Sequence, residues 1–139
     1  MPIEFLECCD TIEESYEFFL AYAGQGLPGD AGSQRDAEIR GFLERTRQAL
    51  SSLTQSCRRA ILQNELQPAE KYEAFCSVLE QDARAALAAV DIVLAQASIS
   101  SQLIDNLNAS GHLRALLTDV FLISEIFESV RKQATPSRS

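Results

Sequence analysis

The segment YEAFCSVLEQDARAALAAVDIVLAQA, residues 72–97, decides the fold of this chain. Its apolar residues recur at alternating steps of three and four, which places them on one stripe of an α-helix. The members of this stripe are Tyr72, Cys76, Leu79, Ala83, Ala86, Val90, Val93 and Ala97. A helix with one apolar stripe buries that stripe against a neighbouring helix. The spacing therefore predicts an all-α protein.

Two segments that precede it show the same spacing, and residues that start or stop helices set their bounds. The first is predicted from residue 2 or 3 to Ala23, where a glycine-rich stretch begins. The second begins after Ser33, which caps it, and runs to about Leu66. Pro68 then begins the helix that contains the segment quoted above. Because the connections are short or moderate, consecutive helices are expected to pack antiparallel.

The last apolar segment is interrupted by weak helix formers at residues 106–111. Either a short helix over residues 101–108 precedes a longer helix capped by Ser110, or a single helix bends near Asn108–Gly111. After the interruption the stripe resumes with Leu113, Leu116, Val120, Ile123, Phe127 and Val130. Together the four segments predict an antiparallel, up-down four-helix bundle whose last helix is split or bent.

Length and composition fit one folded domain. The chain has 139 residues, of which 46% are hydrophobic and 23% charged, as in ordinary globular proteins. We predict that residues 1–134 form a single helical-bundle domain and that residues 135–139 form a disordered C-terminal tail. The longest apolar stretch, residues 113–130, contains too many polar residues for a membrane span, so no membrane association is expected.

The cysteines and the N-terminal sequence bear on the compartment. The chain has four cysteines, and its first residues lack both the basic residues and the uninterrupted apolar core of a signal peptide. This combination favours a reducing, cytoplasmic location. Cys57 and Cys76 lie equally far from the predicted turn between their helices, so they should face each other in the core, where cysteine packs as a small hydrophobe. Cys9 is expected opposite residue 49, and therefore away from Cys57 along the second helix. This separation disfavours a four-cysteine zinc site.

Acidic residues are concentrated in the first predicted helix. The formal net charge is −8, and residues 1–34 hold seven acids and no lysine or arginine. Such a chain lacks the cationic face that nucleic acids require. Four of these acids, which we call the acidic stripe, share one face of the helix; they are Glu7, Asp10, Glu14 and Glu17, with Glu13 beside them. Their mutual repulsion suggests a protein partner with a basic surface, although the acids could also serve only solubility.

The first and last helices carry more apolar residues than a single stripe needs. On a helical wheel, Phe18 and Tyr22 fall away from the stripe of the first helix. In the last helix the surplus consists of Leu117, Phe121, Leu122 and Ile126. This surplus indicates a homodimer or a partner-binding surface on these two helices. The alternative is a centrally placed last helix, with Phe18 as an isolated exposed aromatic residue.

One enzymatic alternative arises from two Glu-x-x-Glu pairs, Glu14 with Glu17 and Glu70 with Glu73. The all-α nucleotide pyrophosphohydrolases hold Mg²⁺ with such pairs, and the resemblance covers these four residues alone, without the second Glu-x-x-Asp motif of that family. Solvated helix faces explain the pairs equally well. The single histidine, His112, has no partner spacing typical of a metal or haem site.

We therefore expect a helical protein without chemistry of its own, which binds a protein partner in an adaptor, regulatory or assembly role. The residues predicted to carry the binding are the acidic stripe together with Phe18, Tyr22, Phe121, Leu122 and Ile126. No cofactor or metal is expected. Two alternatives remain open at this point: the magnesium-dependent enzyme and a small-molecule binder in the core of the bundle.

Overall fold

The computed structural model describes residues 3–134, and all the regular secondary structure in this range is α-helical. The all-α prediction is therefore confirmed for this part of the chain, and residues 135–139, predicted as a disordered tail, lie outside it. Instead of the four expected helices, the described residues form five. They are α1 (Ile3–Ala23), α2 (Gln34–Gln63), α3 (Ala69–Leu94), α4 (Ser101–Ala109) and α5 (His112–Ala134).

The fifth helix results from a break in the last apolar segment. Ser110 closes α4, and its hydroxyl donates to the carbonyl of Leu107 at 2.6 Å. Gly111 follows with a φ of 79°, a left-handed conformation that glycine adopts without steric cost. Of the two alternatives, the short helix before a longer one is thus confirmed. Ser110 ends α4, however, and the prediction that it caps the next helix is wrong.

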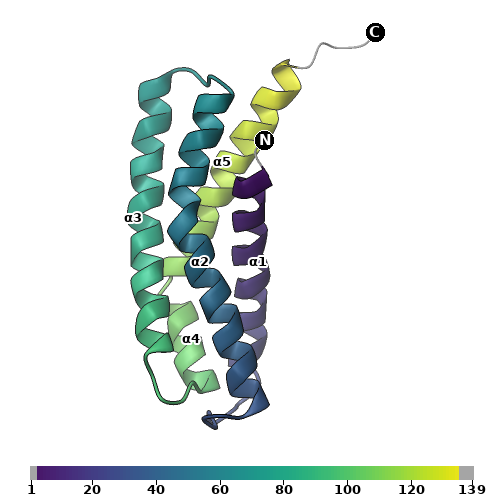
Figure 1. The fold of residues 1–139 in the computed structure, drawn as a ribbon, viewed down its shortest axis with the longest axis vertical. Coiled ribbons are helices and arrows are strands. Elements are labelled where there is room, and N and C mark those ends of the chain that lie inside the picture. The colour runs from purple at the N-terminus through teal and green to yellow at the C-terminus, as the bar shows by residue number, and fades with distance from the viewer. Residues whose placement is uncertain (1–2, 135–139) are drawn as a thin grey trace.

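Figure 1 shows how the helices are arranged. The helices α1, α2 and α3 run in alternating directions beside one another, and α4 and α5 follow each other along the remaining side. Both α4 and α5 contact α1 and α3, whereas α1 does not contact α3 and α2 does not contact α5. The chain thus surrounds one core, to which every helix contributes an apolar stripe.

Most residues of the predicted stripes form this core, whereas Ala97 lies beyond the end of α3 and is exposed. Phe5 and Phe19 of α1 are fully buried, and the ring of Phe5 meets the ring of Phe127 on α5 edge to face, at 5.7 Å between centroids. Burial of one large apolar side chain contributes about 1.5–3 kcal/mol relative to exposure. Other fully buried side chains include Ile12, Ile39, Leu43, Leu53, Leu79, Ile104, Leu113 and Leu116.

A buried network of hydrogen bonds joins the loop after α1 to the start of α4. The backbone of Ser101 donates to the carbonyl of Leu27 at 2.9 Å, and its hydroxyl accepts from the N–H of Leu27 at 2.8 Å. The same hydroxyl donates to the carbonyl of Tyr22 at 2.6 Å. The phenol of Tyr22 in turn donates to the carbonyl of Ile99 at 2.6 Å. These bonds fix two loops that are far apart in the sequence.

The same end of the molecule is held by Arg40 of α2. Its guanidinium donates to the carbonyls of Leu94 at 3.1 Å and Gln96 at 2.6 Å, where α3 ends. It also pairs with the carboxylate of Asp36 at 3.0 Å. The backbone of Asp36 donates to the hydroxyl of Ser33 at 3.1 Å, so the predicted cap of α2 is confirmed.

Candidate functional site

The acidic stripe lies on the outer face of α1. All four of its side chains, Glu7, Asp10, Glu14 and Glu17, are exposed. Among the described residues, no lysine or arginine forms an ion pair with any of them. Partial burial and the charges of Asp10 and Glu17 raise the pKa of Glu13, which lies beside the stripe. The outer face of α1 is therefore a negative surface that the described part of the chain does not neutralise.

A groove of about 430 Å³ separates α1 from the first turns of α5. Its two half-exposed apolar side chains are Leu20 on α1 and Phe121 on α5, with exposed fractions of 50% and 54%. Both walls also carry charge: Glu13 and Glu17 on α1, and Arg114 on α5. The remaining lining residues are Tyr16, Leu117 and Thr118. Apolar surface and unpaired carboxylates thus meet at one place.

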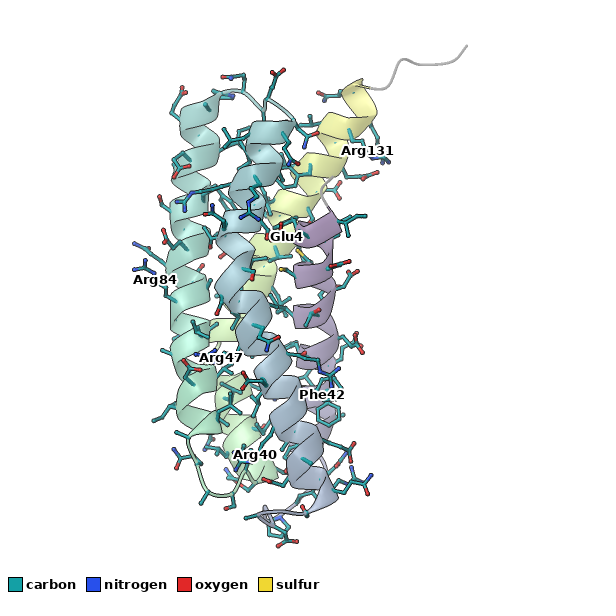
Figure 2. The ribbon with its side chains drawn as sticks, viewed as in Figure 1. Glu4, Arg40, Phe42, Arg47, Arg84 and Arg131 are labelled. Atoms are coloured by element: carbon teal, nitrogen blue, oxygen red, sulfur yellow. The ribbon has the colours of Figure 1, made fainter. Side chains whose placement is uncertain are left out.

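Two residues of the predicted surplus surface point elsewhere. Tyr22 is 1% exposed, and its phenol lies in the buried network described above, so it is not part of the exposed surface of α1. Phe18 is half-buried and stacks on Phe42 of α2 at 4.0 Å between ring centroids, and Figure 2 shows Phe42 projecting from α2 toward α1. The guanidinium of Arg45 lies over the ring of Phe42, at 4.2 Å from its centroid. Both side chains face the neighbouring elements because α1 packs against α2 as well as α4.

The surplus of the last helix is largely at the surface. Phe121 and Leu122 are half-exposed, and Ile126 is 36% exposed. Leu117, predicted with them, is only 5% exposed and belongs to the core. Sequence reasoning did not single out Leu20, which follows Tyr16 by four residues and so lies at the edge of the α1 stripe.

The cysteines pack in the core as free thiols. Cys57 and Cys76 are fully buried and lie beside each other, so the prediction that they face each other is confirmed. On α1 the thiol of Cys8 lies near Ser56 of α2, and the expected place of Cys9 opposite residue 49 stays a prediction. Burial raises the pKa of Cys9 to about 12, and such a thiol is unreactive at neutral pH.

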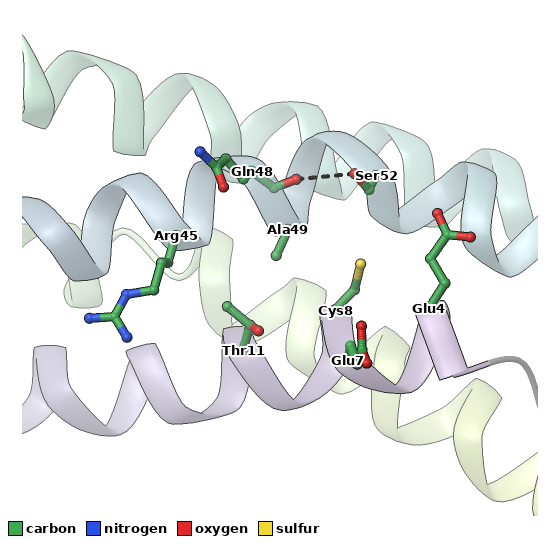
Figure 3. A pocket seen from close by; sticks show the side chains of 8 residues that line it. All are labelled: Glu4, Glu7, Cys8, Thr11, Arg45, Gln48, Ala49 and Ser52. Carbon is green, nitrogen blue, oxygen red and sulfur yellow. Dashed lines mark hydrogen bonds between the residues drawn. The ribbon is translucent and has the colours of Figure 1, made fainter.

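A second groove, of about 280 Å³, lies between α1 and α2 (Figure 3). Small side chains at the seam, among them Ala49 and Ser52, leave this space, and Cys8 points into it from α1. Burial raises the pKa of the Cys8 thiol, and the charges of Glu4 and Glu7 raise it further. The groove therefore offers polar contacts but no activated nucleophile.

A carboxylate pair that sequence reasoning missed lies between α3 and α5. Asp119 of α5 lies beside Asp82 of α3, and the Oδ2 atom of Asp119 is buried without a hydrogen-bond partner. Burial and the neighbouring carboxyl of Asp82 raise the pKa of Asp119 to about 7. The folded protein therefore disfavours the charged form of Asp119.

This pair gives a testable dependence of stability on pH. Since the pKa of Asp119 rises from 3.8 to about 7 on folding, the folded state binds more protons in that window, and its stability falls as the pH rises through it. Asp119→Asn keeps the size and polarity of the side chain and removes its charge. We expect it to raise the free energy of unfolding at pH 8 by about 1 kcal/mol, a value reduced for solvent screening, and to leave it nearly unchanged at pH 4.

Urea denaturation followed by circular dichroism at the two pH values would measure this effect. Asp105→Asn on the exposed face of α4 removes the same charge away from the pair, and it serves as the control. A gain of equal size for both variants at pH 8, or a gain at pH 4 alone, would contradict the assignment.

The two Glu-x-x-Glu pairs of the enzymatic alternative are not brought together. Glu14 and Glu17 lie on α1, Glu70 and Glu73 lie on α3, and these two helices do not contact each other. Glu73 instead binds Arg58 of α2 at 2.9 Å. Within residues 3–134, no group of three or more histidine, cysteine, aspartate or glutamate side chains is arranged to hold a metal ion.

Comparisons of the chain with models of protein families, with curated proteins and with solved structures gave no match. In the described residues, every helix is too short or too polar to cross a bilayer. The case for a function therefore rests on the surface of the molecule itself.

Proposed function

We propose that this protein is a binding module that takes a basic, amphipathic segment of another protein into the groove between α1 and α5. One observation carries the proposal: half-exposed Leu20 and Phe121 share a groove with carboxylates that form no ion pair among the described residues. A helix laid in a groove between two helices is a common form of peptide recognition. Its apolar residues would contact Leu20 and Phe121, and its lysines or arginines would face Glu13, Glu17 and the acidic stripe.

Several features support a role in binding rather than chemistry. The unpaired carboxylates would speed the encounter with a basic partner and disfavour acidic ones. We also propose that α4 and α5 act together as the fourth member of an up-down four-helix bundle, since each contacts both α1 and α3. The free, buried cysteines suit a reducing compartment such as the cytoplasm.

A designed peptide tests the proposal without knowledge of the natural partner. The probe is a helical peptide of leucine and lysine with an amphipathic pattern, and its control has glutamate in place of lysine. We expect calorimetry to detect binding of the lysine peptide alone, with an affinity that falls as salt is added. Glu14→Lys/Glu17→Lys should weaken binding about tenfold or more, because attraction becomes repulsion at two positions.

Two further variants separate the groove from general electrostatics. Glu38→Lys/Glu44→Lys changes the net charge equally at exposed positions of α2, and it should leave the affinity within about twofold. Leu20→Ser removes the apolar contact from the α1 wall and should weaken binding. Equal losses in the two charge variants, or an unchanged affinity in Leu20→Ser, would contradict the proposal.

A further inference from the structure

The outward side of α5 forms a distinct surface, which we call the α5 outer face. It consists of Arg114, Thr118, Phe121, Leu122 and Glu125, and all five side chains are exposed. Phe121 and Leu122 are 54% and 52% exposed and occupy its middle. The core side of the same helix is formed by Leu116, Val120, Ile123 and Phe127, so the outer face contributes nothing to the core.

The charges at the two ends of this face are opposite in sign. Arg114 and Glu125 are eleven residues apart, close to three helical turns, so they lie on one line along the helix at about 16 Å from each other. They are too distant to pair within one molecule. Among the described residues neither forms an ion pair with any other side chain. Along the helix, the face is thus positive at Arg114, apolar at Phe121 and Leu122, and negative at Glu125.

We propose that the α5 outer face docks against the same face of a second copy of this chain, with the two α5 helices antiparallel. A two-fold axis places a surface patch of one copy against the same patch of the other copy, in the reversed direction. Such a patch must therefore be complementary to itself. Here the rotation sets Arg114 of one copy opposite Glu125 of the other, and Glu125 opposite Arg114. Phe121 and Leu122 of the two copies then cover one another between these ion pairs.

The distribution of charge favours a second copy of this chain, rather than a different protein, as the partner of the α5 outer face. The charged side chains on the outer face of α1 are all carboxylates, so two copies would repel each other there. That face suits a basic partner instead. The α5 outer face has no net charge, and its order of charges matches its own reversal. One helix face is smaller than the roughly 1,200 Å² that stable interfaces bury. The dissociation constant of the dimer should therefore be about micromolar or higher.

This dimer stands independently of the proposed function but bears on its regulation. Arg114 and Phe121 also line the groove between α1 and α5. A second copy on the α5 outer face therefore covers one wall of the groove and competes with a bound segment. Leu122→Ser should weaken the dimer alone, and Leu20→Ser the binding of the lysine peptide alone, so failure of one proposal is distinguishable from failure of the other.

A charge swap tests the dimer by sedimentation equilibrium over a wide range of protein concentration. Arg114→Glu and Glu125→Arg each turn both intermolecular pairs into like charges, and each should weaken dimerisation about tenfold or more. The double variant Arg114→Glu/Glu125→Arg restores opposite charges and should return the dissociation constant to within about threefold of the original. An equimolar mixture of the two single variants should form heterodimers, since every pair is then attractive.

The controls use the exposure of these positions. Because both charged side chains are at the surface, circular dichroism melting curves of the variants should match that of the unaltered protein, which excludes unfolding as the cause of a lost dimer. Leu62→Ser, at an exposed position near the end of α2, should leave dimerisation unchanged. A monomer at every concentration, or single charge variants that dimerise as well as the original, would overturn the proposal.

Discussion

Replacing Gly29 with alanine is expected to lower the free energy of unfolding by about 3 kcal/mol, one of the largest effects of any single substitution that we predict here. Gly29 has a φ of 85°, and a Cβ atom at this position would lie 2.9 Å from the backbone nitrogen of Ser100 and 3.0 Å from the carbonyl carbon of Ile99. These are backbone atoms of a loop held by the network around Ser101, so they cannot move aside as a flexible side chain would. The left-handed conformation adds about 1 kcal/mol of strain to the steric clash.

Gly32 provides a matched control within the same loop. Its φ is 81°, but no atom lies within 4 Å of the place where its Cβ would be. Gly32→Ala should therefore cost only the conformational strain, about 1 kcal/mol. Urea unfolding curves of the two variants would measure the difference. Equal losses of stability would mean that the loop does not approach Ile99 and Ser100 as closely as the structure indicates.

Ser101→Ala is expected to cost about 2–3 kcal/mol, which is large for the loss of a single hydroxyl group. Ser101 is 3% exposed, and its hydroxyl accepts from the N–H of Leu27 and donates to the carbonyl of Tyr22. That carbonyl retains the N–H of Gln25 as a donor, at 3.1 Å. The N–H of Leu27 is left without a partner in a partly buried loop, and this unsatisfied donor accounts for most of the cost.

The appropriate control is Ser98→Ala, which removes a hydroxyl from an exposed position three residues earlier. We expect its effect to stay within about 0.5 kcal/mol. Hydrogen exchange of the Leu27 amide adds a local readout, because Ser101→Ala should speed exchange there while helix α2 keeps its protection. A Ser101→Ala protein as stable as the original would show that the bridge between the two loops contributes little.

The helical stripes were predictable because they depend on local geometry alone. Once a segment is helical, steps of three and four place residues such as Phe5, Phe19 and Leu116 on one side, and the structure buries them. Cys57 and Cys76 were predictable for a related reason: a short connection fixes which levels of two consecutive helices face each other. The register of α1 against α2 is harder to predict, since a ten-residue loop of glycine-rich sequence allows several registers between these helices.

The flanks of the helices resisted prediction. A wheel assigns Tyr22 and Phe18 to the side away from the stripe, yet α1 has neighbours on both sides of its stripe, and the side facing α2 buries them or stacks them on Phe42. The pair of Asp82 and Asp119 gave no sequence signal at all. Each is an ordinary polar residue of its own helix, and only the packing of α3 against α5 brings the two carboxyls together.

By itself, the sequence determined the helical class of this protein, the apolar stripes, the cap of α2 and the acidic face of α1, because each follows from interactions between residues close together in the chain. Tertiary structure alone decided which surplus residues remain at the surface, which carboxylates lack a cation, and that Leu20 and Phe121 share one groove. These properties depend on how helices distant in the sequence are placed, and neither periodicity nor composition encodes that placement. The candidate binding surface became visible only once the packed helices had taken up the rest of the apolar surplus.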